Sequence, residues 1–238
     1  MTAIRRCLPV VLAGFAVVHA TGAEARNEGR ATAVSVGADE MSYYRRSAAV
    51  VDSILSGDLG AALAGIAGLE GVARPRALVY ADVHNAIGVA YGESGHFDAA
   101  IAHVGKALGR RDESPPGLVA ESQAYLAYFH AALSQFPEAA RALDDLQAAP
   151  PWLHAKLASA YAGHGNHACA VANAEAALRA GRAGGAVASR WTSSRTAGTV
   201  DREAVLEEWS RRLESLRRSA ALEEQSSGGA ARVLCVGA

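Results

Sequence analysis

The chain has 238 residues, enough for one large domain, and half of them are apolar although few are aromatic. Alanine contributes heavily to the apolar half. Such a composition favours closely packed helices over a sheet sandwich with bulky layers, because alanine is the best helix former. A formal charge of −1 excludes a global electrostatic footprint for nucleic acid or anionic lipid, so we expect no nucleic-acid partner.

The N-terminal segment 1–25 is typical of a cleavable signal peptide. A basic start at Arg5 and Arg6 precedes an apolar run from Cys7 to Val18, and small residues surround Glu24. The run is much shorter than the roughly 20 apolar residues that a membrane span needs. We expect a periplasmic or secreted protein, with 26–40 as a linker and no stable membrane insertion after cleavage.

Cleavage would leave two cysteines, Cys169 and Cys235. Two thiols can pair in an oxidising compartment, but nothing in their spacing dictates that these do. A chain with this many helical residues does not need a covalent link. A free, buried Cys169 is the simpler expectation, and pairing stays open.

From Met41 onward, apolar residues recur at helical spacing over a domain that spans 41–184. Breaks between the expected helices fall at residues 56–58, 74–75, 93–95, 114–117, 134, 150–151 and 163–165. The helices between these breaks come in pairs. The alternation typical of strands is absent, so the sequence predicts an all-α fold.

The clearest pair of helices runs from Ile87 to Leu108. Its marker residues are Gly88 and Tyr91 in the first helix, Gly95 and Phe97 at the turn, and Ala100 and Ala107 in the second helix. Small residues at Gly88 and Ala100 let the two backbones approach closely, and Gly95 permits the tight reversal. This pattern resembles the tetratricopeptide repeat (TPR) motif, with His84 in the place of that family's bulky aromatic residue.

Further copies of the pattern place equivalent alanines at Ala62, Ala100, Ala139 and Ala170, which are separated by 38, 39 and 31 positions. The TPR period is about 34 residues, and loops between repeats accept insertions. The resemblance covers about residues 43 to 184. It implies a right-handed superhelical stack of about four TPR-like helix hairpins with a C-terminal capping helix.

Beyond the repeats, the chain loosens into a predicted loop over 185–200, around Trp191. The segment 201–225 is amphipathic, with an apolar face formed by Val205, Leu206, Trp209, Leu213, Leu216 and Ala220. The last repeat of a solenoid exposes an apolar face, so this helix is expected to cap the stack. A partner-binding helix or a structural homo-oligomer joined through it is the alternative. The tail 226–238 is predicted to be disordered.

The best metal-like cluster is His164, His167 and Cys169, which offers two imidazoles and a thiolate. It lies at a turn between repeat helices, which already explains its polar residues, and no fourth ligand stands at a set spacing from it. The sequence contains neither a Gly-x-Ser-x-Gly elbow nor a P-loop. We expect no enzyme, no cofactor and no metal. A periplasmic enzyme or metal-binding protein that uses this turn is the alternative.

In TPR-like stacks, the first helices of successive repeats line a concave groove. The resemblance places on it Asp82, Asn85 and Val89, then Glu121, Tyr125 and Tyr128, then Trp152, Lys156 and Ser159. Tyr125 and Tyr128 share one helical face, while Leu126, Phe129 and Leu133 offer a separate stripe for packing. We therefore expect the two tyrosines to be free to contact a ligand. The expected function is that of an exported adaptor or scaffold that binds a protein or peptide in this groove.

Overall fold

The computed structural model describes residues 38–70, 77–144, 146, 148–189, 191, 200–227 and 235. Within these ranges there are nine α-helices, one short 3₁₀ helix and no strand, so the predicted all-α class is confirmed. None of the described helices combines the length and apolar character that crossing a membrane would require. The expected signal peptide lies outside the described residues. Most of the linker predicted over 26–40 does too, and the first of the described helices already begins at Ala38.

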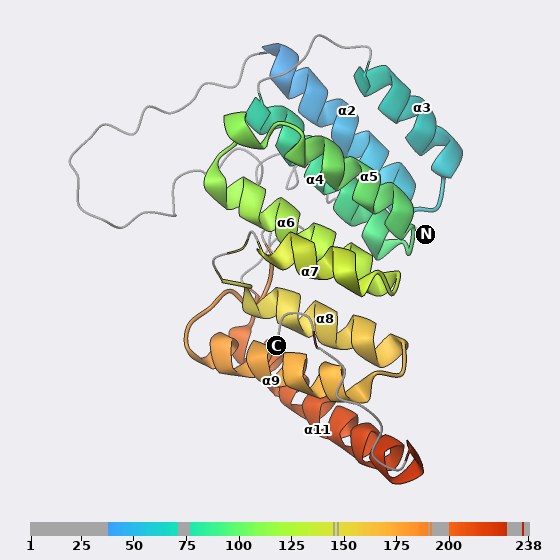
Figure 1. Cartoon of the computed structure of the whole chain (residues 1–238). Helices are drawn as coiled ribbons and strands as arrows, with labels where there is room; N and C mark the ends of the chain where they lie inside the picture. Colours follow the sequence, from blue (N-terminus) through green and yellow to red (C-terminus); the bar gives the residue numbers. More distant parts are fainter. Residues whose placement is uncertain are drawn as a thin grey trace, which may run out of the picture.

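Eight of the described helices form four consecutive hairpins (Figure 1). They are α2 (Ala38–Leu55) with α3 (Leu59–Glu70), α4 (Ala77–Glu93) with α5 (Phe97–Leu108), α6 (Pro116–Ala132) with α7 (Phe136–Asp144), and α8 (Pro151–Gly163) with α9 (His167–Arg182). A single 3₁₀ turn, η3 (Arg111–Glu113), leads from the second hairpin to the third. The predicted number of hairpins is confirmed, and the handedness of the stack stays a prediction.

Each hairpin reverses through the same backbone turn. A residue with positive φ follows the first helix, at Gly57 (82°), Gly95 (80°), Ser134 (60°) and Gly165 (75°). The next residue then donates its N–H to a carbonyl near the end of that helix, as His96 does to Tyr91 at 2.9 Å. This Schellman arrangement satisfies carbonyls that the helix end leaves without a donor. Glycine favours the turn because it has no Cβ to clash at positive φ.

The predicted repeat register is visible in the packing of its alanines. Ala62, Ala100, Ala139 and Ala170 are each 0% exposed. A Cβ added to Gly88 would lie 2.8 Å from a Val104 methyl and 3.1 Å from the carbonyl oxygen of Ala100. Helices α4 and α5 therefore meet closely at the two small residues that the sequence marks.

Two histidines, His84 and His103, are buried between α4 and α5. They are 2% and 7% exposed, and their Nδ1 atoms lie 3.0 Å apart, so one ring donates the hydrogen bond and the other accepts it. The ring of Tyr80 packs edge-on against His84 at a centroid distance of 4.3 Å. Burial lowers the pKa of His84 to about 3, with the charges of His103 and then Lys106 acting in the same direction. Burial, followed by the charge of Lys106, lowers the pKa of His103 to about 4. Both rings are therefore neutral at pH 7.

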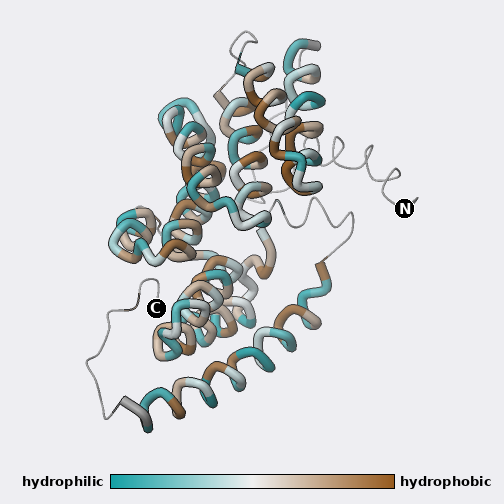
Figure 2. Tube along the Cα trace, turned by 90° about the vertical axis from the view of Figure 1, so that its right-hand side faces the viewer, coloured by the Kyte–Doolittle hydropathy of each residue, from teal (hydrophilic) through white to brown (hydrophobic). Residues whose placement is uncertain are grey.

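Helix α11 (Arg202–Ser227) packs on α9 and ends the stack, as Figures 1 and 2 show. Its residues Leu206, Leu213 and Leu216 are buried in a hydrophobic cluster with Ala170, Ala174 and Leu178 of α9. The predicted capping role is confirmed. The apolar face that would have joined a homo-oligomer is thus largely used inside the chain.

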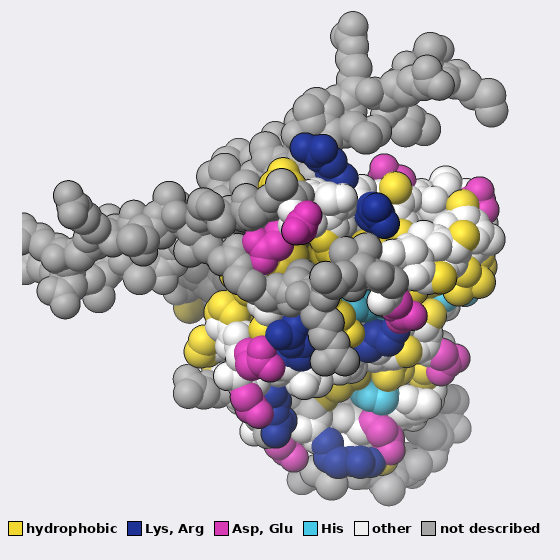
Figure 3. Space-filling model, turned by 90° about the horizontal axis from the view of Figure 1, so that it is seen from above, with side chains coloured by type: hydrophobic (Ala, Val, Ile, Leu, Met, Phe, Trp, Pro, Cys, Tyr) yellow, Lys and Arg dark blue, Asp and Glu magenta, His cyan; other side chains and the backbone are white. Residues whose placement is uncertain are grey.

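The surface carries charges of both signs. Figure 3 shows acidic and basic side chains interspersed, with hydrophobic ones between them, on the face seen from above. This mixture agrees with the formal charge of −1. A continuous basic strip that could follow a phosphate backbone is not seen on the described part of this face.

Candidate binding groove

A pocket of about 290 Å³, here named the groove pocket, lies between the first helices of three hairpins and the start of α11. One wall comes from α4, α6 and α8. It includes six residues that the sequence predicts for the groove: Val89, Tyr125, Tyr128, Trp152, Lys156 and Ser159. Glu93, Phe129 and Ala155 complete this wall. The remaining lining residues belong to the segment after α9 and to the start of α11: Val187, Ala188, Ser189, Val200, Val205, Trp209 and Arg212.

Three of the predicted groove residues lie outside the pocket. Asp82 is 4% exposed, and one of its carboxylate oxygens accepts a hydrogen bond from the hydroxyl of Tyr44, in α2, at 3.3 Å. Asn85 is also 4% exposed and exchanges hydrogen bonds of 2.8 and 3.0 Å with Ser122 Oγ in α6. Glu121 is partly exposed on α6.

The prediction that Asp82 and Asn85 line the groove is therefore wrong, because both are buried between helices. Each lies where neighbouring first helices meet, and a polar side chain buried at such an interface is stable only with a hydrogen-bond partner. Their partners belong to other hairpins, so these residues link successive hairpins.

Tyr125 belongs to the core. Its side chain is 4% exposed, and its ring centroid lies 5.9 Å from that of Phe129 and 4.9 Å from that of Trp152. Its hydroxyl donates a hydrogen bond to Ser189 Oγ at 2.6 Å. The prediction that both tyrosines are free is thus wrong for Tyr125, because a segment 64 positions later in the chain covers it.

Tyr128 and Lys156 form an accessible part of the groove pocket. The Lys156 ammonium lies 5.3 Å from the centroid of the Tyr128 ring, within the range of a cation–π interaction, and Lys156 is exposed. Burial, followed by the nearby charge of Glu93, raises the pKa of the Tyr128 hydroxyl, so this group is protonated near neutral pH. Ser159 donates its hydroxyl to the carbonyl of Ala155 at 2.9 Å.

The predicted loop over 185–200 supplies the covering segment, which the sequence did not place in the site. We name Gly185–Ser189 together with Trp191 the strap. Trp191 is 7% exposed and shares a hydrophobic cluster with Tyr125 and Trp152. The only local signal for this role is a large aromatic residue among small and polar ones, and such a signal does not reveal which surface the residue covers.

The turn with His164, His167 and Cys169 does not assemble a metal site. His164 forms a hydrogen bond to Ser134 Oγ at 2.9 Å, whereas His167 pairs with Glu223 of α11 at 3.2 Å. The sulfur of Cys169 is already bonded to another sulfur. In the part of the chain that the structure describes, no group of three or more His, Cys, Asp or Glu is placed to hold a metal ion.

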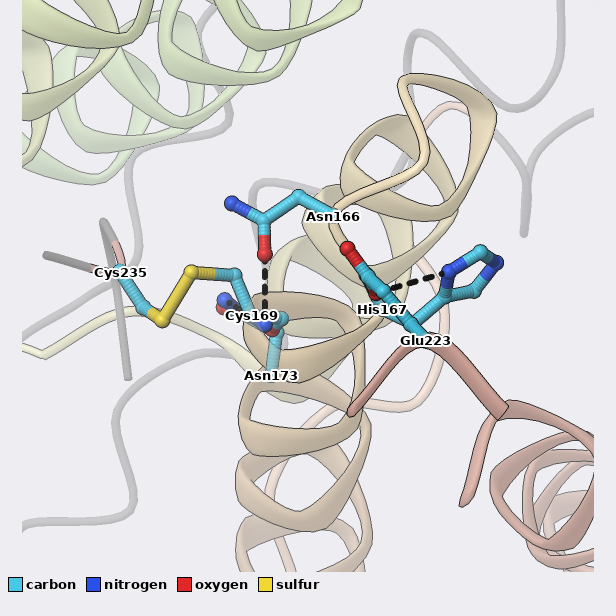
Figure 4. Close-up of a disulfide and its surroundings, with 6 residues drawn as sticks. All are labelled: Asn166, His167, Cys169, Asn173, Glu223 and Cys235. Atoms are coloured by element: carbon cyan, nitrogen blue, oxygen red, sulfur yellow. Dashed lines mark hydrogen bonds and ion pairs between the residues drawn. A yellow bond between two sulfur atoms is a disulfide. The ribbon is translucent and has the colours of Figure 1, made fainter. Parts of the chain in front are cut away.

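Cys169 is buried as expected, at 0% exposure, but it is not free. It forms a disulfide with Cys235, 66 positions later, at a Cα–Cα distance of 5.1 Å (Figure 4). The same end of α9 meets the end of α11 through His167 and Glu223. These links fasten the C-terminal segment to the last hairpin.

The chain matches no protein-family model, no curated protein and no solved structure.

Proposed function

We propose that this protein is an exported adaptor or scaffold of the TPR type, which binds a protein or peptide partner through the groove pocket. The observation that carries the proposal is the meeting of six predicted groove residues from α4, α6 and α8 in one pocket. Aromatic rings and apolar walls with a few charged groups are typical of sites that hold an anchoring side chain of a partner.

The disulfide supports the exported location. Disulfides persist in oxidising compartments and are rare in the cytosol. Cys169 and Cys235 are the two cysteines that remain if the segment 1–25 is removed, and they are paired. Together with the signal-peptide pattern, this pairing favours the periplasm or the cell exterior.

The charges around the pocket favour a protein partner over a nucleic acid. Glu93, Lys156 and Arg212 all line the pocket, so its charged groups have mixed sign. Nucleic-acid binding surfaces are dominated by basic groups. A mixed rim around aromatic rings instead suits a polypeptide segment.

Affinity capture with the mature chain as bait tests this function. The captured partner would then be purified and its dissociation constant measured. Truncating an aromatic anchor often costs about 2 kcal/mol of binding free energy, so Tyr128→Ala is expected to weaken binding roughly thirtyfold. Lys156→Ala is expected to weaken it by a smaller factor.

Lys106→Ala is the matched control, because Lys106 is a partly exposed lysine that pairs with Glu70 outside the pocket. Circular dichroism must show that all variants remain folded. If folded Tyr128→Ala and Lys156→Ala proteins bind the partner as tightly as the Lys106→Ala control, the groove pocket is not the binding surface.

A further inference from the structure

The strap lies on a surface that the repeat pattern assigns to a partner. Ser189 is 5% exposed and accepts the hydroxyl hydrogen of Tyr125, and Trp191 is buried in the same cluster as Trp152. Val187 and Ala188 form part of the pocket wall beside them. One end of the groove is thus occupied by the protein's own chain, while Tyr128 and Lys156 remain open beside it.

The strap is held at its start and along its inner side. The N–H of Gly185 donates to the carbonyl of Ala180 at 3.0 Å, and the guanidinium of Arg202 donates to the carbonyl of Gly185 at 3.2 Å. Ala186 is exposed, whereas Ser189 and Trp191 are buried. Val187 and Ser189 are spaced two apart, which is the spacing at which side chains of an extended segment share one face, and Trp191 lies in a helical turn just beyond them.

We propose that the strap is an intramolecular ligand of the groove, and that the partner displaces it with a segment of similar chemistry. That segment has an apolar residue, a small hydroxyl residue two positions later, and an aromatic residue two positions after that. The proposal rests on the proposed adaptor function and specifies the partner and the regulation of the same site.

The architecture allows the strap to leave without unfolding the stack. Residues 185–189 belong to no helix or strand, so no ladder of backbone hydrogen bonds ties them to the groove. Helix α11 keeps its hydrophobic cluster with α9 through Leu206, Leu213 and Leu216, to which the strap adds the partly buried Val187. The groove pocket beside the strap offers a partner a first contact before displacement.

A competing internal segment lowers the apparent affinity of any external ligand. The apparent dissociation constant equals the intrinsic one divided by the fraction of molecules with an open groove. Weakening the strap should therefore tighten the binding of a peptide that copies it. A strap that is a permanent part of the fold would leave no place for such a peptide.

The test uses a fluorescently labelled, capped peptide with the sequence of residues 185–195. Trp191→Ala is expected to bind this peptide at least tenfold more tightly than the wild type, because the peptide's own tryptophan fills the vacated site. Ala186→Ser, at an exposed position of the strap, is the matched protein control and should bind like the wild type. A peptide with alanine in place of its tryptophan is the ligand control.

Equal peptide affinity of folded Trp191→Ala and wild-type proteins would overturn the proposal. Hydrogen exchange of the wild-type chain provides a readout even if Trp191→Ala fails to fold. The amides of residues 186–189 should exchange at least tenfold faster than those of α8. Equal protection would mean that the strap opens only by global unfolding, which also overturns the proposal.

The outcomes separate this inference from the adaptor function itself. If Tyr128→Ala weakens binding of the partner but Trp191→Ala leaves it unchanged, the adaptor function stands and strap displacement is overturned. Tight binding of the strap peptide to Trp191→Ala supports strap displacement. This holds even if Tyr128→Ala leaves capture of the partner unchanged, a result that would contradict the proposed binding surface.

Discussion

Lowering the pH from 7 to 5 is expected to destabilise the fold through the buried pair His84 and His103. Burial holds the pKa of these rings near 3 and near 4 in the folded state, against 6.5 for a histidine in an unfolded chain. Below pH 6.5 the unfolded chain therefore takes up protons that the folded protein does not. The stability from keeping both rings neutral is fully present above pH 6.5, and it is lost as the pH falls towards 4.

The expected loss follows from linkage between proton binding and folding. A pH of 5 is about 1.5 units below the pKa of each ring in the unfolded chain and still above its pKa in the folded protein. The loss in free energy of unfolding is then roughly 2 kcal/mol per ring. For the two rings together the free energy of unfolding falls by about 4 kcal/mol, a large fraction of the 5–15 kcal/mol by which a typical domain is stable. His154, whose pKa burial also lowers, acts in the same direction. The nearby ion pair between Lys106 and Glu70 faces both histidines and modifies their pKa values with opposite signs.

Urea unfolding followed by circular dichroism at pH 7 and pH 5 measures the effect. The double variant His84→Phe with His103→Leu should lose most of the pH dependence, because neither new side chain titrates. His96→Gln is the control, since His96 is an exposed histidine of the adjacent turn. If the double variant folds and keeps the pH dependence of the wild type, the buried pair is not its source and the reasoning is refuted.

Three further predictions concern the stack itself. Ala100→Leu should destabilise the protein by about 1–3 kcal/mol more than Ala102→Leu, because Ala100 is 0% exposed and Ala102 faces solvent; equal melting temperatures would show that the register is wrong. Gly95→Ala should cost about 1 kcal/mol and Ser134→Gly should cost nothing or stabilise slightly, since both positions have positive φ; chemical unfolding that ranks the two changes in the opposite order would contradict the shared turn. Cys235→Ser should lower stability by about 2–4 kcal/mol, as opening a disulfide loop commonly does; guanidinium unfolding without reductant measures it, and a midpoint equal to that of the wild type would contradict a structural disulfide.

The helices and hairpin turns were predictable because their causes are local. Apolar spacing sets which face of each helix is buried, and a glycine such as Gly95 marks where positive φ ends a helix. The buried alanines Ala100 and Ala139 follow from the same repeat register. The amphipathic pattern of 201–225 likewise indicates a cap, since a helix with one apolar face must cover something.

Which of the predicted residues line the groove depends on contacts between distant segments of the chain. Asp82 pairs with a residue 38 positions away, Asn85 with one 37 away, and Tyr125 with one 64 away. Helical periodicity identifies the face on which a residue lies, but it contains no information about which other segment covers that face. For this reason the sequence by itself determined the hairpins, their register and six of the residues that line the groove pocket. Only the tertiary structure decided that the strap covers Tyr125 and that Cys169 pairs with Cys235, because both depend on how non-local segments pack together.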